Sequence, residues 1–221
     1  MNLSTIKSLV IPEGLVKRVL IGGKTIWEKP ALYTPIDYIE VTGTQYINTG
    51  FTPNNNSRMI VDLEFTVLNS SNQVAGSRYT TTSGAFAFGL NASGKLRFGY
   101  GNNYYDGTGD VNMERRVLEL DKNTFYMNGV LAGTAPESTF NGYTQICVGS
   151  VKATKMYAGY AKFYSCQIYD DGTLIRDFVP CINADGEIGM WDKVEDKFYG
   201  NAGSGEFIIP TVGENIDNHG E

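Results

Sequence analysis

The chain has 221 residues, of which 42% are hydrophobic and 19% charged, a composition that can bury a core and excludes a disordered protein. Its 18 basic and 24 acidic residues give a net charge of −6, so no basic surface for nucleic-acid phosphates is expected. The 26 glycines, 14 tyrosines and 11 phenylalanines favour short strands joined by tight turns. We therefore expect an all-β protein with one main core.

The N-terminal residues 1–30 are predicted to form a small β-hairpin arm. The apolar runs LVKRVLI and KTIWEK flank Gly22 and Gly23, which is typical of a hairpin with a glycine turn, and Pro30 closes the segment. Because an isolated two-stranded hairpin is marginal in water, the arm is expected to dock on its own sandwich or on a partner.

The apolar residues before Pro12 are too few for a signal peptide, and no later run approaches bilayer length, so neither secretion nor membrane insertion is expected. The three cysteines, Cys147, Cys166 and Cys181, include no C-x-x-C pair. An odd cysteine count argues against a full disulfide framework. Synthesis in a reducing cytoplasm fits both observations.

Residues 31–210 alternate strand and turn signals and are predicted to form the main domain. Residues 59–65 place alternate apolar side chains on one face, the period of a half-buried strand. The stretch GYAKFYSCQIYDDG is apolar or aromatic at nearly every second position on both registers, which predicts a central strand buried on both faces. Further hairpins are predicted with turns at 91–94, Asn128-Gly129 and Asp171-Gly172.

No window carries a sustained helical period with a capping signature, so any helix should be a short turn. Many short strands with glycine and asparagine turns indicate a β-sandwich or barrel, and no fixed repeat suggests a propeller or solenoid. The polar residues 211–221 are expected to be a flexible acidic tail.

Three stretches resemble a known group of domains. IDYIEVTGTQYINTGFTPNNNSRMIVDLEF resembles the opening strands of a laminin G-like module, and AKFYSCQIYDDGTLIRDFVPCINADGEIGMWDKVEDKFYGNAGSGEF resembles its closing strands. NTFYMNGVLAGT is similar to a strand-turn-strand of concanavalin A-like lectins and laminin G domains. The resemblance covers roughly residues 33 to 209 and implies a concanavalin A-like jelly-roll sandwich.

The N-terminal piece TIKSLVIPEGLVKRVLIGGKTIWEK is similar to short modules that precede such domains in phage minor structural proteins. The resemblance therefore implies a phage or prophage virion accessory protein, made in the bacterial cytoplasm. In this interpretation the arm contacts other virion proteins, and the sandwich serves as an adhesin for surface carbohydrate or as a structural decoration, with a homo-oligomer expected. A bacterial surface adhesin is the alternative, since host and prophage genes share these modules, and the superfamily also includes glycoside hydrolases.

The strongest candidate binding cluster is GYGNNYYDGTGD, a predicted loop. Tyrosine rings stack on the apolar faces of sugars while amides and carboxylates bond the hydroxyls, and tyrosine serves protein interfaces equally well. Packing of Tyr100 and one neighbour on the core is the competing interpretation. A second candidate rim is SRYTTTSG around Arg78 and Tyr79. The candidate carbohydrate-binding residues are Tyr79, Tyr100, Asn102, Asn103, Tyr104, Tyr105 and Asp106.

Catalysis is not expected. The only histidine, His219, lies in the polar tail, which excludes a histidine-based triad or a histidine-rich zinc site in the folded domain. Asp62 and Glu64 alternate onto one face as a glycosidase pair would, but that face is expected to be solvent-exposed and a third acid is missing. Trp27 and Trp191 lie in apolar strand-like contexts and are expected to pack in the core.

Calcium is possible and no other cofactor is expected. Its oxygen ligands would come from Asp106 and Asp110, or from Asp170 and Asp171. Asp-Gly turns explain the same residues without a metal. Cys166 and Cys181 could be neighbours on consecutive strands, with two buried apolar thiols as the default interpretation.

Overall fold

The structure is a computed structural model that describes residues 18–21, 24–28, 32–68, 72–79, 84–152 and 156–210. Every regular element in these ranges is a β-strand, as the composition predicts. None of the described segments forms a helix that is long and apolar enough to cross a membrane. The chain divides into two compact units, residues 1–32 and 33–221.

The first unit contains the expected hairpin. Strands β1 (Arg18–Ile21) and β2 (Lys24–Glu28) pair antiparallel, with Ile21 opposite Lys24 and a register shift between Val19 and Leu20. The glycines of the predicted turn and residues 1–17 lie outside the described residues.

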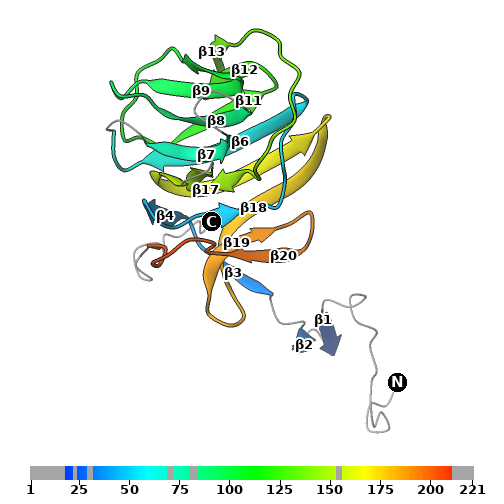
Figure 1. Ribbon diagram of the computed structural model, residues 1–221. Helices are drawn as coiled ribbons and strands as arrows, with labels where there is room; N and C mark the ends of the chain where they lie inside the picture. The colour runs from blue at the N-terminus through cyan, green and yellow to red at the C-terminus, as the bar shows by residue number, and fades with distance from the viewer. Residues whose placement is uncertain are drawn as a thin grey trace. The chain divides into compact units, whose positions relative to one another are not determined.

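The second unit is a sandwich of two sheets (Figure 1). The strand pairs are antiparallel, apart from a short parallel contact of β15 with β7. The eight-stranded sheet has the order β10-β9-β8-β7-β14-β5, with β15 pairing β7 and β16. Its strands are β5 (Ile47–Asn48), β7 (Gln73–Ser77), β8 (Ala85–Leu90), β9 (Leu96–Gly101), β10 (Asn103–Asp106), β14 (Cys147–Val148), β15 (Ser150–Lys152) and β16 (Met156–Ala158).

The ten-stranded sheet has the order β13-β12-β11-β6-β17-β18-β19-β20, with β4 pairing β17 and β3 pairing β18. Figure 1 shows β19 and β20 extending this sheet beyond β18. Its strands are β3 (Tyr33–Pro35), β4 (Ile39–Thr42), β6 (Ser57–Phe65), β11 (Arg116–Asp121), β12 (Thr124–Met127), β13 (Val130–Thr134), β17 (Tyr160–Asp170), β18 (Thr173–Asn183), β19 (Ile188–Asp192) and β20 (Lys197–Gly200).

The inner faces of the two sheets make one aromatic-rich core, which confirms the all-β sandwich. Phe98 of the eight-stranded sheet stacks on Phe125 of the ten-stranded sheet, with ring centroids 5.0 Å apart, and Phe88 lies 6.0 Å from the same ring. Burying one such side chain contributes about 1.5–3 kcal/mol. The fully buried phenylalanines are Phe65, Phe86, Phe88, Phe98, Phe125, Phe163 and Phe178.

Strand β6 alternates buried and half-buried residues over its whole length, as predicted. Strand β17 is central, as expected, but it is not buried on both faces. Its residues alternate in burial, and a register shift between Phe163 and Ser165 changes which positions face inward. The bulge, together with outward tyrosines, accounts for a sequence that is apolar on both registers.

The predicted hairpin turns are confirmed. The β8–β9 turn is closed by the Asn91 side chain, which accepts from the backbone N–H of Ser93 and Lys95. Asn128 and Gly129 have φ of 52° and 75°, and Asp171 and Gly172 have φ of 47° and 79°, as type I′ turns require. The expected tail, residues 211–221 with His219, lies outside the described residues.

Candidate functional site

The tyrosine-rich segment 99–110 is mainly a tight hairpin rather than the predicted loop. Strands β9 and β10 pair across it, with Tyr104 opposite Gly99. Tyr100 faces the core and is only 4% exposed, and its hydroxyl lies 3.3 Å from the backbone oxygen of Asn55. Burial raises the pKa of Tyr100. The alternation of β9 thus corrects the expectation of an exposed ring at Tyr100.

The other members of the cluster are divided between the two faces of the eight-stranded sheet. Tyr105 packs on Phe98 at 5.5 Å and joins the core. Tyr104 lies on the outer face, where the guanidinium of Arg78 is 5.6 Å from its ring centroid. The structure therefore does not gather the three tyrosines into one platform.

The polar residues of the cluster do not complete a site either. The pKa of Asp106 is lowered by hydrogen bonding from Asn91, and Asp106 also forms an ion pair with Arg97 at 3.1 Å. Asn102 and Asn103 are exposed at the turn of the hairpin.

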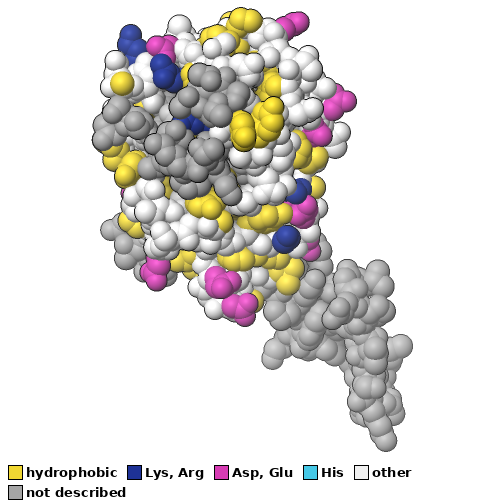
Figure 2. Space-filling model, in the orientation of Figure 1, with side chains coloured by type: hydrophobic (Ala, Val, Ile, Leu, Met, Phe, Trp, Pro, Cys, Tyr) yellow, Lys and Arg dark blue, Asp and Glu magenta, His cyan; other side chains and the backbone are white. Residues whose placement is uncertain are grey.

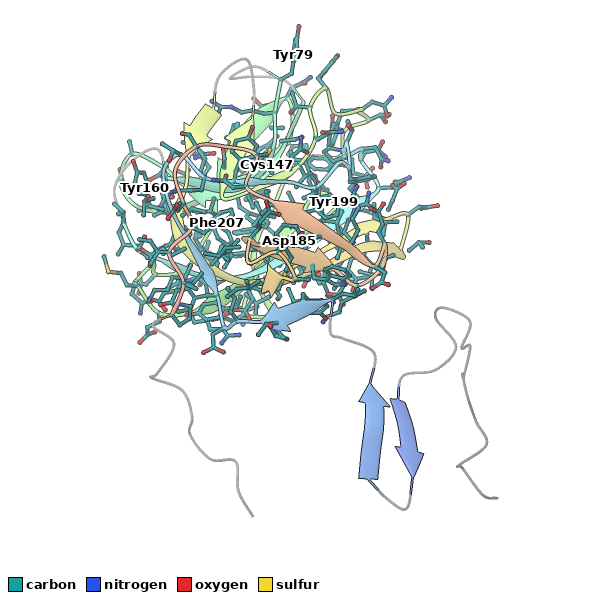
Figure 3. All side chains as sticks on the ribbon, turned by 90° about the horizontal axis from the view of Figure 1, so that it is seen from below. Tyr79, Cys147, Tyr160, Asp185, Tyr199 and Phe207 are labelled. Carbon is teal, nitrogen blue, oxygen red and sulfur yellow. The ribbon has the colours of Figure 1, made fainter. Side chains whose placement is uncertain are left out.

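The most exposed aromatic residues among the described ones are Tyr79 and Tyr143, which we call the tyrosine pair. Tyr79 is 45% exposed and Tyr143 is 66% exposed. Their ring centroids are 4.5 Å apart with an interplanar angle of 34°. Figure 3 shows the Tyr79 side chain standing out from the body of the sandwich. Two exposed rings in contact offer a ligand apolar ring surface together with two hydroxyl groups.

The tyrosine pair is built by two chain segments that meet at the end of β7. Tyr79 follows the buried Arg78, and the hydroxyl of Thr144, next to Tyr143, lies 3.1 Å from the backbone oxygen of Arg78. At Gly84, which has a φ of +61°, a Cβ would lie 2.8 Å from the Tyr143 ring. Glycine at this position therefore lets the Tyr143 ring approach the backbone.

Tyr79 is one of the predicted site residues, whereas Tyr143 is not among them. The available signal was a single tyrosine directly after Asn141 and Gly142, in a segment without the alternation of a buried strand. Residues 80–83 of the predicted rim lie outside the described residues. The face shown in Figure 2 carries several hydrophobic patches among polar side chains and backbone.

The two carboxylates of the hydrolase hypothesis lie on the outer face of β6, as predicted, and both are held by cations. Asp62 accepts from Arg115 at 2.9 and 2.8 Å. Glu64 accepts from Lys162 at 3.0 Å and from the Tyr164 hydroxyl at 3.1 Å. These hydrogen bonds raise the pKa values of Arg115 and Lys162. Both carboxylates are thus occupied as charge partners and are not presented to a substrate.

The described residues contain no group of three or more histidine, cysteine, aspartate or glutamate side chains that could hold a metal ion. Of the candidate calcium ligands, Asp106 is paired with Arg97, and Asp170 accepts from the Asn54 amide at 3.0 Å. Asp171 occupies its positive-φ turn position, and the side chain of Asp110 lies on an exposed segment.

Trp191 is 7% exposed and stacks on Tyr33 with centroids 4.7 Å apart, which confirms the expected core packing. The side chain of Trp27 is outside the described part of the chain. The three cysteines are buried, and none of them forms a disulfide bond. Cys166 lies opposite Phe178 rather than Cys181 in the β17–β18 ladder. Burial raises the pKa of Cys166, and that of Cys181 to about 11, which favours the neutral thiol over the nucleophilic thiolate at both positions.

Comparison with known proteins assigns no role to any of these residues. No protein-family model and no curated protein matches the chain. The candidate site therefore rests on the geometry of the tyrosine pair.

Proposed function

We propose that this chain is a carbohydrate-binding accessory protein of a phage virion, with a concanavalin A-like, laminin G-like sandwich that binds host-surface glycans. The observation that carries the binding part is the tyrosine pair. Large aromatic rings are usually at least half-buried, so two rings exposed in contact favour a surface kept for a ligand. Tyrosine rings offer sugars an apolar face at low entropic cost.

The virion part of the proposal is supported by the resemblance of the N-terminal segment to modules of phage minor structural proteins. Residues 1–32, which include the hairpin β1–β2, form a compact unit of their own, which suits an attachment element. We propose that this unit binds other virion proteins or a neighbouring copy of the chain.

The ion pairs of Asp62 and Glu64 favour a role in binding over a role in catalysis. Asp62 and Glu64 are the acids that most resemble a glycosidase pair, and each is engaged by a cation at 3.0 Å or less. An enzyme of this class needs one carboxyl group as an acid and one as a nucleophile or base, which ion pairing hinders.

The direct test is a glycan array on the full chain, followed by calorimetry with the best glycan. Tyr143→Ala should weaken binding about 2- to 12-fold, since an aromatic stacking contact contributes about 0.5–1.5 kcal/mol. Tyr143→Phe should bind like the original chain if the ring face is what the sugar contacts.

Met113→Ala is the matched control, because Met113 is 54% exposed and lies outside the tyrosine pair. It should leave affinity unchanged. If Tyr143→Ala binds as tightly as Met113→Ala, or if the array shows no glycan binding at all, the proposed role of the tyrosine pair is wrong.

A further inference from the structure

A second feature at the surface of the sandwich is a hollow between two turns. It has a volume of about 400 Å³, enough for one sugar ring with its hydration, and we call it the turn hollow. The β11–β12 turn and the β17–β18 turn form its two sides. The residues that line it are Asn56, Arg58, Asp121, Lys122, Asn123, Thr124, Tyr126, Tyr169, Asp171 and Gly172.

The two turns have a defined backbone conformation at the positions of Asp121 and Asp171. Lys122 and Asp171 adopt positive φ values of 52° and 47°, and Gly172 follows with 79°. Such turns are short and leave the backbone little freedom. Within the described residues, the carboxylates of Asp121 and Asp171 have no hydrogen-bond or ion-pair partner. They are free to accept hydrogen bonds from a ligand.

Two tyrosine rings line the hollow. Tyr169 is engaged by neighbouring side chains, whereas Tyr126 is available to a ligand. Tyr169 is held by its hydroxyl, 3.2 Å from Gln167, and by the guanidinium of Arg58, 5.0 Å from its centroid. Arg58 in turn bonds Glu119 at 2.7 Å. Tyr126 is half-buried and, among the described residues, has neither a hydrogen-bond partner nor a ring partner. A ring with this placement is suited to stacking on a ligand.

The charges around the hollow select against anions. Arg58 is neutralised by Glu119, so Asp121, Asp171 and Lys122 leave the lining with a small negative excess. Hydroxyl groups can donate to both carboxylates, and a neutral sugar ring supplies several of them. The combination of a free ring, free acceptors and no excess cation therefore favours a neutral pyranose.

The turn hollow and the tyrosine pair belong to the same end of the sandwich. A β-bridge joins Asn54 to Asn141, and the backbone N–H of Gly142 donates to Pro53 at 2.6 Å. The Asn54 amide also donates to Asp170, next to Asp171, at 3.0 Å. The asparagine-rich segment 54–56 thus connects the loop of Tyr143 with the turn of Asp171.

We propose that the turn hollow is a second sugar subsite, in which a neutral pyranose stacks on Tyr126 and donates hydroxyl hydrogens to Asp121 and Asp171. The ligand is then a neutral oligosaccharide that spans the hollow and the tyrosine pair along segment 54–56. This inference rests on the proposed glycan-binding function and names the class of glycan.

The test is an NMR titration of the isotope-labelled full chain with galactose, glucose, mannose and N-acetylglucosamine, each as the monosaccharide and as a short linear oligomer. With at least one oligomer, we expect amide shifts at both Lys122 and Gly142, and tighter binding than with its monosaccharide. Asp171→Gly and Tyr126→Ala should each weaken oligomer binding about tenfold, the scale of a hydrogen bond to a charged group or a stacking contact.

Asp196→Gly is the matched control, because Asp196 also has a positive φ, 53°, in an exposed turn but lies outside the hollow. Glycine tolerates the positive φ at positions 171 and 196, so both turns should be retained. Asp171→Gly therefore tests the second subsite even if Tyr126→Ala fails to fold.

If an oligomer shifts Gly142 but not Lys122, and Asp171→Gly binds like Asp196→Gly, the second subsite is wrong while the proposed function stands. If none of these sugars shifts either amide and the glycan array is also empty, both fail.

Discussion

A single buried carboxylate ties together three segments at one edge of the ten-stranded sheet. Asp192 is fully buried, and its Oδ1 accepts from the backbone N–H of Asp177 at 2.9 Å and of Val194 at 3.0 Å. Its Oδ2 lies 3.5 Å from Nε of Arg176, whose Nη1 contacts Glu195 at 2.8 Å. A buried charge is tolerated when it is paired and hydrogen-bonded in this way.

Replacing Asp192 by alanine should therefore lower the free energy of unfolding by about 3 kcal/mol, because Arg176 and two backbone N–H groups lose a buried partner. Denaturant unfolding measures this change. Asp106→Asn is the control, since Asp106 and Arg97 have side chains that are 53% and 40% exposed and such pairs contribute about 0–1 kcal/mol. Equal losses in the two variants would contradict the role given to Asp192.

At the scale of the strands, the position of β7 in its sheet depends more on a close backbone contact than on the strand propensity of its residues. Strand β7 carries a register shift against β8 between Gln73 and Ala75, and it passes so close to β8 that only glycine fits at Gly76. At its φ of +130°, a Cβ would overlap the carbonyl oxygen of Phe86 and the Cα of Ala87. The bulge and Gly76 act together to seat β7 between β8 and β14.

Gly76→Ala should destabilise the chain by about 3 kcal/mol or more, from the strained φ and from overlap with a packed backbone. Gly129→Ala is the matched variant, since Gly129 also has a positive φ, +75°, but nothing lies within 4 Å of its Cβ position. Its loss should be about 1–2 kcal/mol. Thermal unfolding of both variants checks the difference, and an equal loss would show that overlap at Gly76 is relieved without cost.

The hairpin turns and the alternating strand β6 are the elements that local sequence patterns predict correctly. The turns at Asn128-Gly129 and Asp171-Gly172 were predictable because only a few residue types tolerate two successive positive φ values. The alternation of β6 was equally visible, since one buried face imposes a period of two. The glycines and asparagines of segment 99–110 resemble turn residues and predict a loop, whereas the pairing of β9 with β10 makes much of the segment a hairpin.

At the scale of the whole molecule, the buried hydrophobic cluster formed by the described side chains lies in the unit that begins at Tyr33. It consists of residues from Ile39 to Phe207. The sandwich should therefore fold without residues 1–32. The hairpin β1–β2 makes a separate unit, and a hairpin of this size contributes little stability alone.

A chain that starts at Tyr33 should unfold at the same temperature as the full chain and retain glycan binding. Where residues 1–32 bind a neighbouring copy of the chain, the full chain should assemble and the shorter chain should be monomeric. Light scattering coupled to size-exclusion chromatography gives both masses, and calorimetry gives both affinities. A shorter chain that assembles like the full one would contradict an attachment role for residues 1–32.

The sequence by itself determined the all-β class, the hairpin turns and the outward position of Asp62 and Glu64, because alternation and turn chemistry act between near neighbours. Only the tertiary structure decided that Tyr79 meets Tyr143 and that Tyr100 faces inward. It also decided that the β11–β12 and β17–β18 turns enclose a hollow. These contacts join segments far apart in the chain, and they depend on strand order and register, which arise from packing of the whole sandwich and leave no local pattern.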